Sequence, residues 1–292
     1  MRDDRGVAAD GDDGGEIRET VYLLDARSMK IKDREVFAVA PVTCFKRSYK
    51  NKRYELEGGQ ASGFFYKHKD LLYFITNRHV VIDESNGYYP DQICLDLHTD
   101  PNNPGKPKKK LWMELYKDNN MKIPRWIGHP HNQEFQSWEK TIDVVAVPVE
   151  EDLSGYHVEP FTNERIVPPE FGVSIGNEVL VIGYPLGFWD HAHNLPIVRN
   201  ATIASVYQVP FSGKPGILID ARLHPGTSGS PVVTYIGYPE KLLLGVHSEE
   251  FYNTNGTRSD EPLGLNFVWF SGLILDIVSQ RSDYFDSLDC KI

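Results

Sequence analysis

The chain has 292 residues, of which 40% are hydrophobic and 12% aromatic, so it can bury a sizeable core. Its net charge of -10 argues against nucleic acid as a main partner, because phosphate binding needs a basic face. No stretch approaches the ~20 apolar residues of a membrane-spanning helix, so we expect no membrane partner.

The first 20 residues, 1–20, are rich in Asp and Gly and contain no apolar run. We expect no secretory signal peptide there, because such a segment needs a basic start and an apolar run of ~7–15 residues. We expect residues 1–20 to be disordered, because they have little to bury, and the protein to be cytoplasmic. The three cysteines, Cys44, Cys94 and Cys290, are too few and odd in number for a disulfide framework, and we expect buried free thiols.

Short apolar or alternating segments separated by turn residues predict strands along most of the chain. In the first half they lie at residues 36–42, 63–66, 71–76, 93–98, 111–116 and 143–149. Residues 151–174 are polar, contain prolines and have no sustained period, which is typical of a connection. In the second half strands are predicted at residues 179–182, 201–207, 217–221, 231–236, 242–247 and 263–270, and a helix at 271–278.

One segment of the second half has the pattern of a catalytic loop. Gly226-Thr227-Ser228-Gly229 places a serine within a glycine-rich turn, just before the apolar strand predicted at 231–236. Glycine permits a turn that points successive N–H groups at one spot, as stabilisation of an oxyanion requires. The alternative is an ordinary glycine-rich β-turn that happens to contain serines, since short motifs give false positives.

Two upstream residues could serve such a serine. His79 follows an apolar strand, and Asp143 leads into another. A serine hydroxyl needs a base, and the base needs an orienting acid. Alone, His79 could be a core histidine and Asp143 a turn residue, but the order His, Asp, Ser is that of chymotrypsin-type enzymes.

These three segments resemble the triad segments of trypsin-like serine proteases, and most closely those of the disulfide-free bacterial Deg-type proteases and glutamyl endopeptidases. Residues 60–65 (Gln-Ala-Ser-Gly-Phe-Phe) and 179–187 resemble further strands of these branches. The resemblance implies an all-β fold of two six-stranded antiparallel β-barrels with a C-terminal helix. It further implies a first barrel at 21–150, a crossover at 151–174, and a second barrel plus helix at 175–292.

The resemblance also assigns roles, and the activity it implies is that of a serine endopeptidase acting through an acyl-enzyme. His79 would be the general base, Asp143 would orient it, and Ser228 would be the nucleophile. The N–H groups of Gly226 and Ser228 would form the oxyanion hole. Ser248, on the strand along the specificity pocket, would donate a hydrogen bond to Asp143.

Substrate specificity rests on fewer residues. The resemblance places His247 on the wall of the specificity pocket and Arg222 at its floor, which predicts cleavage after Glu, Asp or Gln. Glu249 and Glu250 follow on the same strand; if they point inward, cleavage after Lys or Arg is predicted instead. A preference for Val, Ala or Leu would mean that Arg222 turns away from the pocket.

We expect a protein or peptide substrate, and the sequence identifies no regulatory protein partner. His129 with His131, and His191 with His193, lie in apparent loops without cysteine partners, so we expect neither a metal site nor a cofactor. The alternatives to a peptidase are a catalytically silent pseudoprotease that binds proteins and an esterase-like hydrolase. The intact triad pattern disfavours the pseudoprotease, and the strand pattern and triad order disfavour the esterase.

Overall fold

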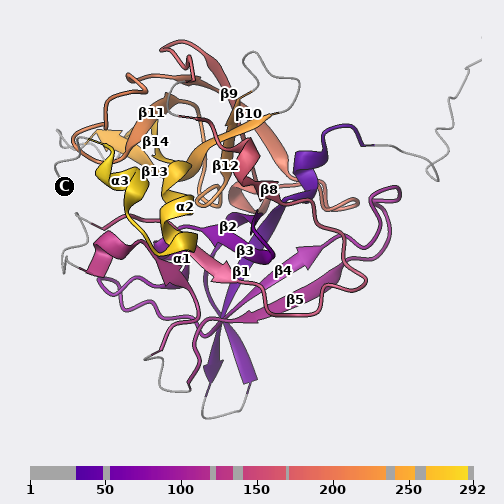
Figure 1. Ribbon diagram of the computed structural model, residues 1–292. Coiled ribbons are helices and arrows are strands. Elements are labelled where there is room, and N and C mark those ends of the chain that lie inside the picture. The colour runs from indigo at the N-terminus through magenta and orange to yellow at the C-terminus, as the bar shows by residue number, and fades with distance from the viewer. Residues whose placement is uncertain are drawn as a thin grey trace, which may run out of the picture.

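The computed structural model describes residues 31–48, 53–118, 123–133, 141–168, 171–234, 241–253 and 261–288. The prediction for residues 1–20 and that for Cys290 lie outside these ranges. The chain forms two barrel-like halves, one from its first part and one from its second, with the C-terminal helices beside them (Figure 1). Cys44 and Cys94 are both buried free thiols.

The first half is an eight-stranded sheet with the order β5-β4-β1-β2-β3-β7-β6, and β8 pairs in parallel with β2. Its strands are β1 (Val39–Ser48), β2 (Arg53–His68), β3 (Leu71–Thr76), β4 (Gln92–Leu97), β5 (Lys109–Glu114), β6 (Ile127–Gly128), β7 (Val145–Pro148) and β8 (Phe161–Thr162). Short helices interrupt it: η2 (Arg34–Phe37), α1 (Arg78–Val81), η3 (Pro130–Gln133) and η5 (Asn163–Arg165).

The double-barrel fold expected from the sequence is confirmed, with one difference in the first half. The six strands expected there do not form a closed ladder, because β5 and β6 do not pair directly. The chain beyond β5 spans the gap: Arg125 N–H donates to the Leu115 carbonyl at 2.9 Å, and Lys117 N–H donates to the Ile123 carbonyl at 2.8 Å. The sheet therefore forms an almost closed barrel.

The second half is a closed barrel with the strand order β10-β11-β14-β13-β12-β9. Its strands are β9 (Glu178–Gly183), β10 (Ile197–Ile203), β11 (Gly216–Asp220), β12 (Pro231–Thr234), β13 (Leu242–Asn253) and β14 (Glu261–Phe270), and η6 (Pro185–Gly187) follows β9. The chain continues into α2 (Gly272–Ser279) and α3 (Asp283–Asp286). Helix α2 lies against β6 and β7, so the C-terminal part of the chain packs on the first half.

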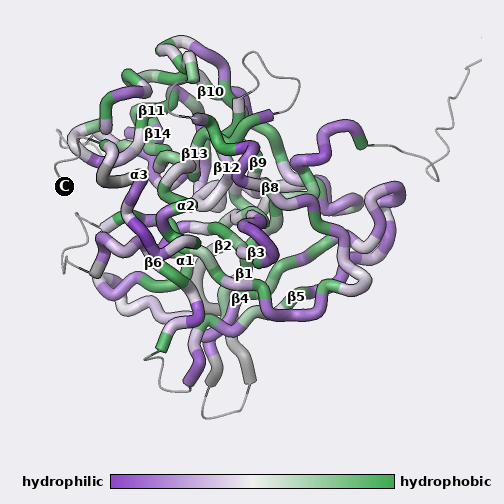
Figure 2. Tube along the Cα trace, in the orientation of Figure 1, coloured by the Kyte–Doolittle hydropathy of each residue, from purple (hydrophilic) through white to green (hydrophobic). Residues whose placement is uncertain are grey.

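Strand alternation gives each half its own core and a third core between the halves. In β2, Phe65 points into the first half, whereas Phe64 and Tyr66 point toward the second. Phe64 packs edge-to-face on Phe161 of β8, with ring centroids 5.5 Å apart. Figure 2 shows the hydrophobic segments running along the strands and through α2. The buried interface between the halves fixes the geometry of any site built from both.

A buried acid also holds distant segments together. Glu35 of η2 accepts a hydrogen bond from Arg165 at 2.6 Å and lies 3.3 Å from Lys241 Nζ. Burial alone would raise the pKa of Glu35, but hydrogen bonds from the backbone and from Arg165, together with the Lys241 charge, lower it below the ordinary 4.5. The ionised carboxylate therefore links η2 to the connection between the halves and to the start of β13.

Candidate active site

The antiparallel pairing of β3 with β7 brings His79 and Asp143 together. Thr76 is the Cα partner of Val145, so the residues just beyond each strand end lie side by side. His79 is in α1, directly after β3, and Asp143 stands two residues before β7 begins. Ser228 lies in the loop between β11 and β12 of the other half. The site therefore spans the interface between the two halves.

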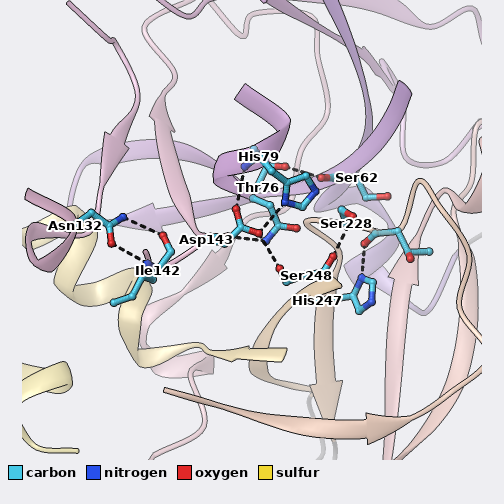
Figure 3. A network of polar contacts seen from close by, with 11 residues as sticks. Ser62, Thr76, His79, Asn132, Ile142, Asp143, Ser228, His247 and Ser248 are labelled. Carbon is cyan, nitrogen blue, oxygen red and sulfur yellow. Dashed lines mark hydrogen bonds and ion pairs between the residues drawn. The ribbon is translucent and has the colours of Figure 1, made fainter. Parts of the chain in front are cut away.

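Asp143 holds the His79 ring at two points. Its Oδ1 accepts the His79 backbone N–H at 2.9 Å, and its Oδ2 lies 2.7 Å from His79 Nδ1 (Figure 3). Because the carboxylate only accepts, Nδ1 bears a hydrogen and Nε2 is left with the lone pair of the neutral ring. Burial alone would lower the pKa of His79, but the charge and hydrogen bond of Asp143 outweigh it and raise that pKa above the ordinary 6.5.

Asp143 is itself held by three neighbours. Ser248 Oγ donates to its Oδ2 at 2.7 Å, and Asn77 Nδ2 donates to its backbone carbonyl at 2.7 Å. Asn132 forms two hydrogen bonds with the backbone of Ile142, the residue before Asp143. Its Nδ2 donates to the Ile142 carbonyl at 3.0 Å, and its Oδ1 accepts the Ile142 N–H at 2.8 Å. Asp143 is 6% exposed as a residue, so these contacts, more than water, set the direction of its carboxylate. Sequence reasoning missed both asparagines.

The loop that carries Ser228 depends on glycine. Gly226 has a φ of +97° and Gly229 a φ of +84°, both in the left-handed region that favours glycine. A Cβ at Gly226 would lie 2.7 Å from the Tyr184 carbonyl oxygen, and one at Gly229 would lie 2.2 Å from the Ser62 carbonyl oxygen. Neither position has room for another residue.

Ser62 of β2 ties this loop to the first half. Its hydroxyl donates to the Gly226 carbonyl at 2.8 Å, and its N–H donates to the Ser228 carbonyl at 2.9 Å. Gly229 N–H donates to the His247 carbonyl on β13 at 2.9 Å. Among the described residues, no acceptor takes the N–H of Gly226 or that of Ser228. These two amides are therefore available to a ligand.

In this structure the Ser228 hydroxyl donates to the main-chain oxygen of Ser248 at 3.1 Å, and no hydrogen bond joins it to His79. Both side chains line the same pocket and lie next to each other in Figure 3. The structure thus brings together His79, Asp143, Ser228, Gly226 and Ser248.

The sequence of residues 61–238 matches the trypsin-like peptidase domain family. The chain belongs to this family. The solved structure of the HtrA-type protease AlgW with a decapeptide resembles this one with a TM-score of 0.51 and 16% sequence identity. The match covers 87% of this chain and 66% of that chain, and at this identity it shows a shared fold. A search of the curated proteins found no match.

A pocket lies beside Ser228. It is a hollow of about 300 Å³. It is lined by His79, Leu223, His224, Pro225, Thr227, Ser228, His247, Ser248, Glu249, Glu250, Tyr252 and Asn266. Asn266 of β14, which sequence reasoning missed, lies at its buried end: its Nδ2 donates to the Ala221 carbonyl at 2.7 Å.

His247 lines the pocket and is 3% exposed. Its Nδ1 lies 3.0 Å from the Thr227 carbonyl and its Nε2 lies 3.2 Å from Asn266 Oδ1. The carbonyl can only accept, so Nδ1 carries a hydrogen. Burial lowers the pKa of His247, which favours the neutral ring.

The expectation that Arg222 forms the pocket floor is wrong. Its side chain is exposed and does not line the pocket, and its carbonyl accepts a hydrogen bond from Arg199 at 2.7 Å. Ala221 and Leu223 on either side are buried, and Arg222 is the exposed residue between them. The described lining of the pocket therefore does not include the arginine on which the expected preference for acidic residues depended.

No group of three or more possible metal ligands occurs within the part of the chain that the structure describes. The paired histidines have protein partners instead. His129 Nδ1 accepts the His131 N–H at 3.1 Å, so its Nε2–H faces Asp276 Oδ2 of α2, 3.3 Å away. His193 Nδ1 lies 2.6 Å from Asp190. Nor does any helix in the described ranges have the length and apolar character needed to cross a membrane.

Proposed function

We propose that this protein is a serine endopeptidase that hydrolyses peptide bonds through His79, Asp143 and Ser228. The observation that carries the proposal is the chain of contacts from Ser248 through Asp143 to His79, which leaves Nε2 of a ring that lines the same pocket as Ser228 without a hydrogen.

The reaction begins when Ser228 Oγ attacks the carbonyl carbon of the bond to be cut and His79 Nε2 takes the hydroxyl proton. Asp143 keeps the ring in the tautomer that can accept this proton and stabilises the imidazolium that results. The carbonyl oxygen becomes negative as the tetrahedral intermediate forms. The N–H groups of Gly226 and Ser228 would stabilise it, each such donor being worth about 10²–10³ in rate.

Collapse of the intermediate breaks the C–N bond, and the amine leaves with the proton held by Nε2. The acyl group then remains on Ser228 Oγ. A water molecule gives its proton to Nε2, attacks the ester carbon and releases the acid, after which the proton returns to Ser228.

A peptide is the substrate class that this arrangement supports best. The match to the trypsin-like peptidase domain supports it, and the structural neighbour AlgW is recorded with a decapeptide. The two described cysteines, Cys44 and Cys94, are free thiols, which supports our proposal of the reducing cytoplasm as its compartment.

The test compares hydrolysis of a peptide panel and an ester panel by wild type, Ser228→Ala and Ser230→Ala. Ser230 is a matched control, because its buried hydroxyl makes no hydrogen bond among the described residues and lies two positions further on. We expect peptide hydrolysis to be lost in Ser228→Ala and kept in Ser230→Ala. Full peptidase activity in Ser228→Ala would overturn the proposal, and wild-type hydrolysis of esters alone would favour the esterase alternative. A wild type that binds peptides without cutting them would favour the pseudoprotease.

A further inference from the structure

The pocket beside Ser228 carries the negative charge of two glutamates, Glu249 and Glu250. Among the described residues that line it there is no lysine or arginine. Among the described residues, neither glutamate forms an ion pair with a lysine or arginine. Two adjacent carboxylates repel each other, so a cation that enters the pocket gains from both.

Glu250 is the better placed of the two. It is the Cα partner of Asn266 in the β13–β14 ladder, so the two residues lie side by side, and both line the pocket. Tyr252, another lining residue, donates its hydroxyl hydrogen to Glu250 Oε2 at 3.1 Å, which orients the carboxylate at the pocket edge. Glu250 is half-buried, whereas Glu249 is exposed. A partly desolvated carboxylate forms the stronger contact with a cation.

At the buried end of the pocket, the polar groups of His247 and Asn266 are paired within the protein. The Nδ1–H of His247 is taken by Thr227, and the Nδ2 of Asn266 is taken by Ala221. His247 Nε2 lies 3.2 Å from Asn266 Oδ1, so these two atoms face each other. Lysine and arginine carry hydrogen-bond donors alone, which match the carboxylates of Glu249 and Glu250 in the pocket lining.

The size of the pocket fits a single side chain. Its volume of about 300 Å³ is at the lower limit of the ~300–1,000 Å³ typical of ligand pockets. A site that is built to pair a polar group strongly rejects analogues that lack it, because its own groups would be left unpaired.

We infer that the residue before the cleaved bond is lysine or arginine, and that Glu250 is its specificity-determining partner. The inference rests on the proposed function, since it names the substrate class of the same site. Glu249 adds negative charge at the entrance of the pocket but does not orient the side chain of the substrate.

The test measures kcat/KM for one peptide sequence with arginine, lysine, citrulline, glutamine, glutamate or alanine before the cleaved bond. Citrulline keeps the shape of arginine and removes its charge. A charge-assisted hydrogen bond is worth a factor of about 10–100, so arginine should exceed citrulline by at least this ratio. Glu250→Gln should lower kcat/KM for the arginine peptide by a similar factor and leave the citrulline peptide unchanged.

Glu261→Gln is the matched control, because it removes an exposed carboxylate from the end of β14, outside the pocket lining. It should leave the ratio of arginine to citrulline as in wild type. All variants are also labelled with a small fluorophosphonate, which reacts with the nucleophile without filling the pocket. Equal labelling rates in wild type and Glu250→Gln show that the variant is folded and its triad intact.

Two results overturn the inference while the proposed function stands: fastest cleavage after glutamate, glutamine or alanine with normal labelling, or an arginine preference that Glu250→Gln does not reduce. Wild type that neither labels nor cleaves any peptide contradicts the proposed function itself, so the two failures are distinguishable.

Discussion

Replacing Asp143 by asparagine changes one atom and should reverse the tautomer of His79. The backbone N–H of His79 always donates, and it points at Oδ1 from 2.9 Å, so the amide oxygen of the variant stays at that position. The NH₂ group then takes the place of Oδ2, 2.7 Å from His79 Nδ1. Nδ1 must now accept, so the ring hydrogen moves to Nε2. A ring with its hydrogen on Nε2 cannot take the proton of Ser228.

The magnitude follows from this geometry. A wrong tautomer in a triad of this kind lowers kcat by about 10⁴, which corresponds to about 5.5 kcal/mol at about 1.36 kcal/mol for each tenfold.

The pH dependence of activity should change as well. The base must be neutral to act, and Asp143 raises the pKa of His79 above 6.5, so wild-type activity should rise only above that pH. Without the Asp143 charge, burial remains and lowers the pKa, so the rise should move to lower pH.

The assay is the pH profile of kcat/KM on a peptide substrate for wild type, Asp143→Asn and Asp152→Asn. Asp152→Asn is the control, since it makes the same chemical change at an exposed residue outside the site. It should match wild type. A loss of less than tenfold in Asp143→Asn, or an acid limb that does not move, would refute the assignment of Asp143 as the residue that orients the base.

Three further predictions test other parts of the site and fold. Gly226→Ala forces a Cβ to 2.7 Å from the Tyr184 oxygen at a φ of +97° and should lower kcat by about 10²–10³ in steady-state assays; an unchanged kcat would contradict the oxyanion role. Asn132→Ala should lower kcat about 3–10-fold with little change in KM, and Asn132→Asp, which keeps the acceptor for the Ile142 N–H, should recover part of the loss. Equal losses of kcat in both variants would argue against a role for the two hydrogen bonds between Asn132 and the Ile142 backbone. Glu35→Gln should lower the free energy of unfolding by about 1–3 kcal/mol in urea at neutral pH. The folded pKa of Glu35 lies below 4.5, so its stabilising contribution is present above pH 4.5 and is lost as the pH falls through the folded pKa. The difference in unfolding free energy between wild type and Glu35→Gln should therefore shrink in acid. A difference that stays constant with pH would contradict this role of the Glu35 carboxylate.

The parts of the fold that the sequence predicts well are those in which local pattern and burial agree. The alternating residues 93–98 correspond to β4 at Gln92–Leu97, and the helix expected at 271–278 corresponds to α2 at Gly272–Ser279. The two-residue strand β8 was not predicted, because its pairing depends on Phe161 packing against β2, which no local pattern records.

The polar contacts that support the site were harder to predict. Ser62 is 164 residues from Gly226, and Asn77 is 66 residues from Asp143. Such pairs meet only when the sheets have folded, so sequence spacing gives no signal for them. The prediction for Arg222 failed for a local reason. Arg222 is exposed, whereas the residues directly before and after it are buried, so an error of one position decides whether a side chain faces inward.

The central claim is that Ser228 is the nucleophile, and mass spectrometry of a fluorophosphonate adduct tests it most directly. The intact protein is labelled, digested and sequenced by fragmentation, with Ser228→Ala treated in parallel. We predict a single adduct on Ser228 in wild type, formed faster above the pKa of His79, and no adduct in Ser228→Ala. An adduct on Ser230, or labelling of Ser228→Ala at the wild-type rate, would contradict the account.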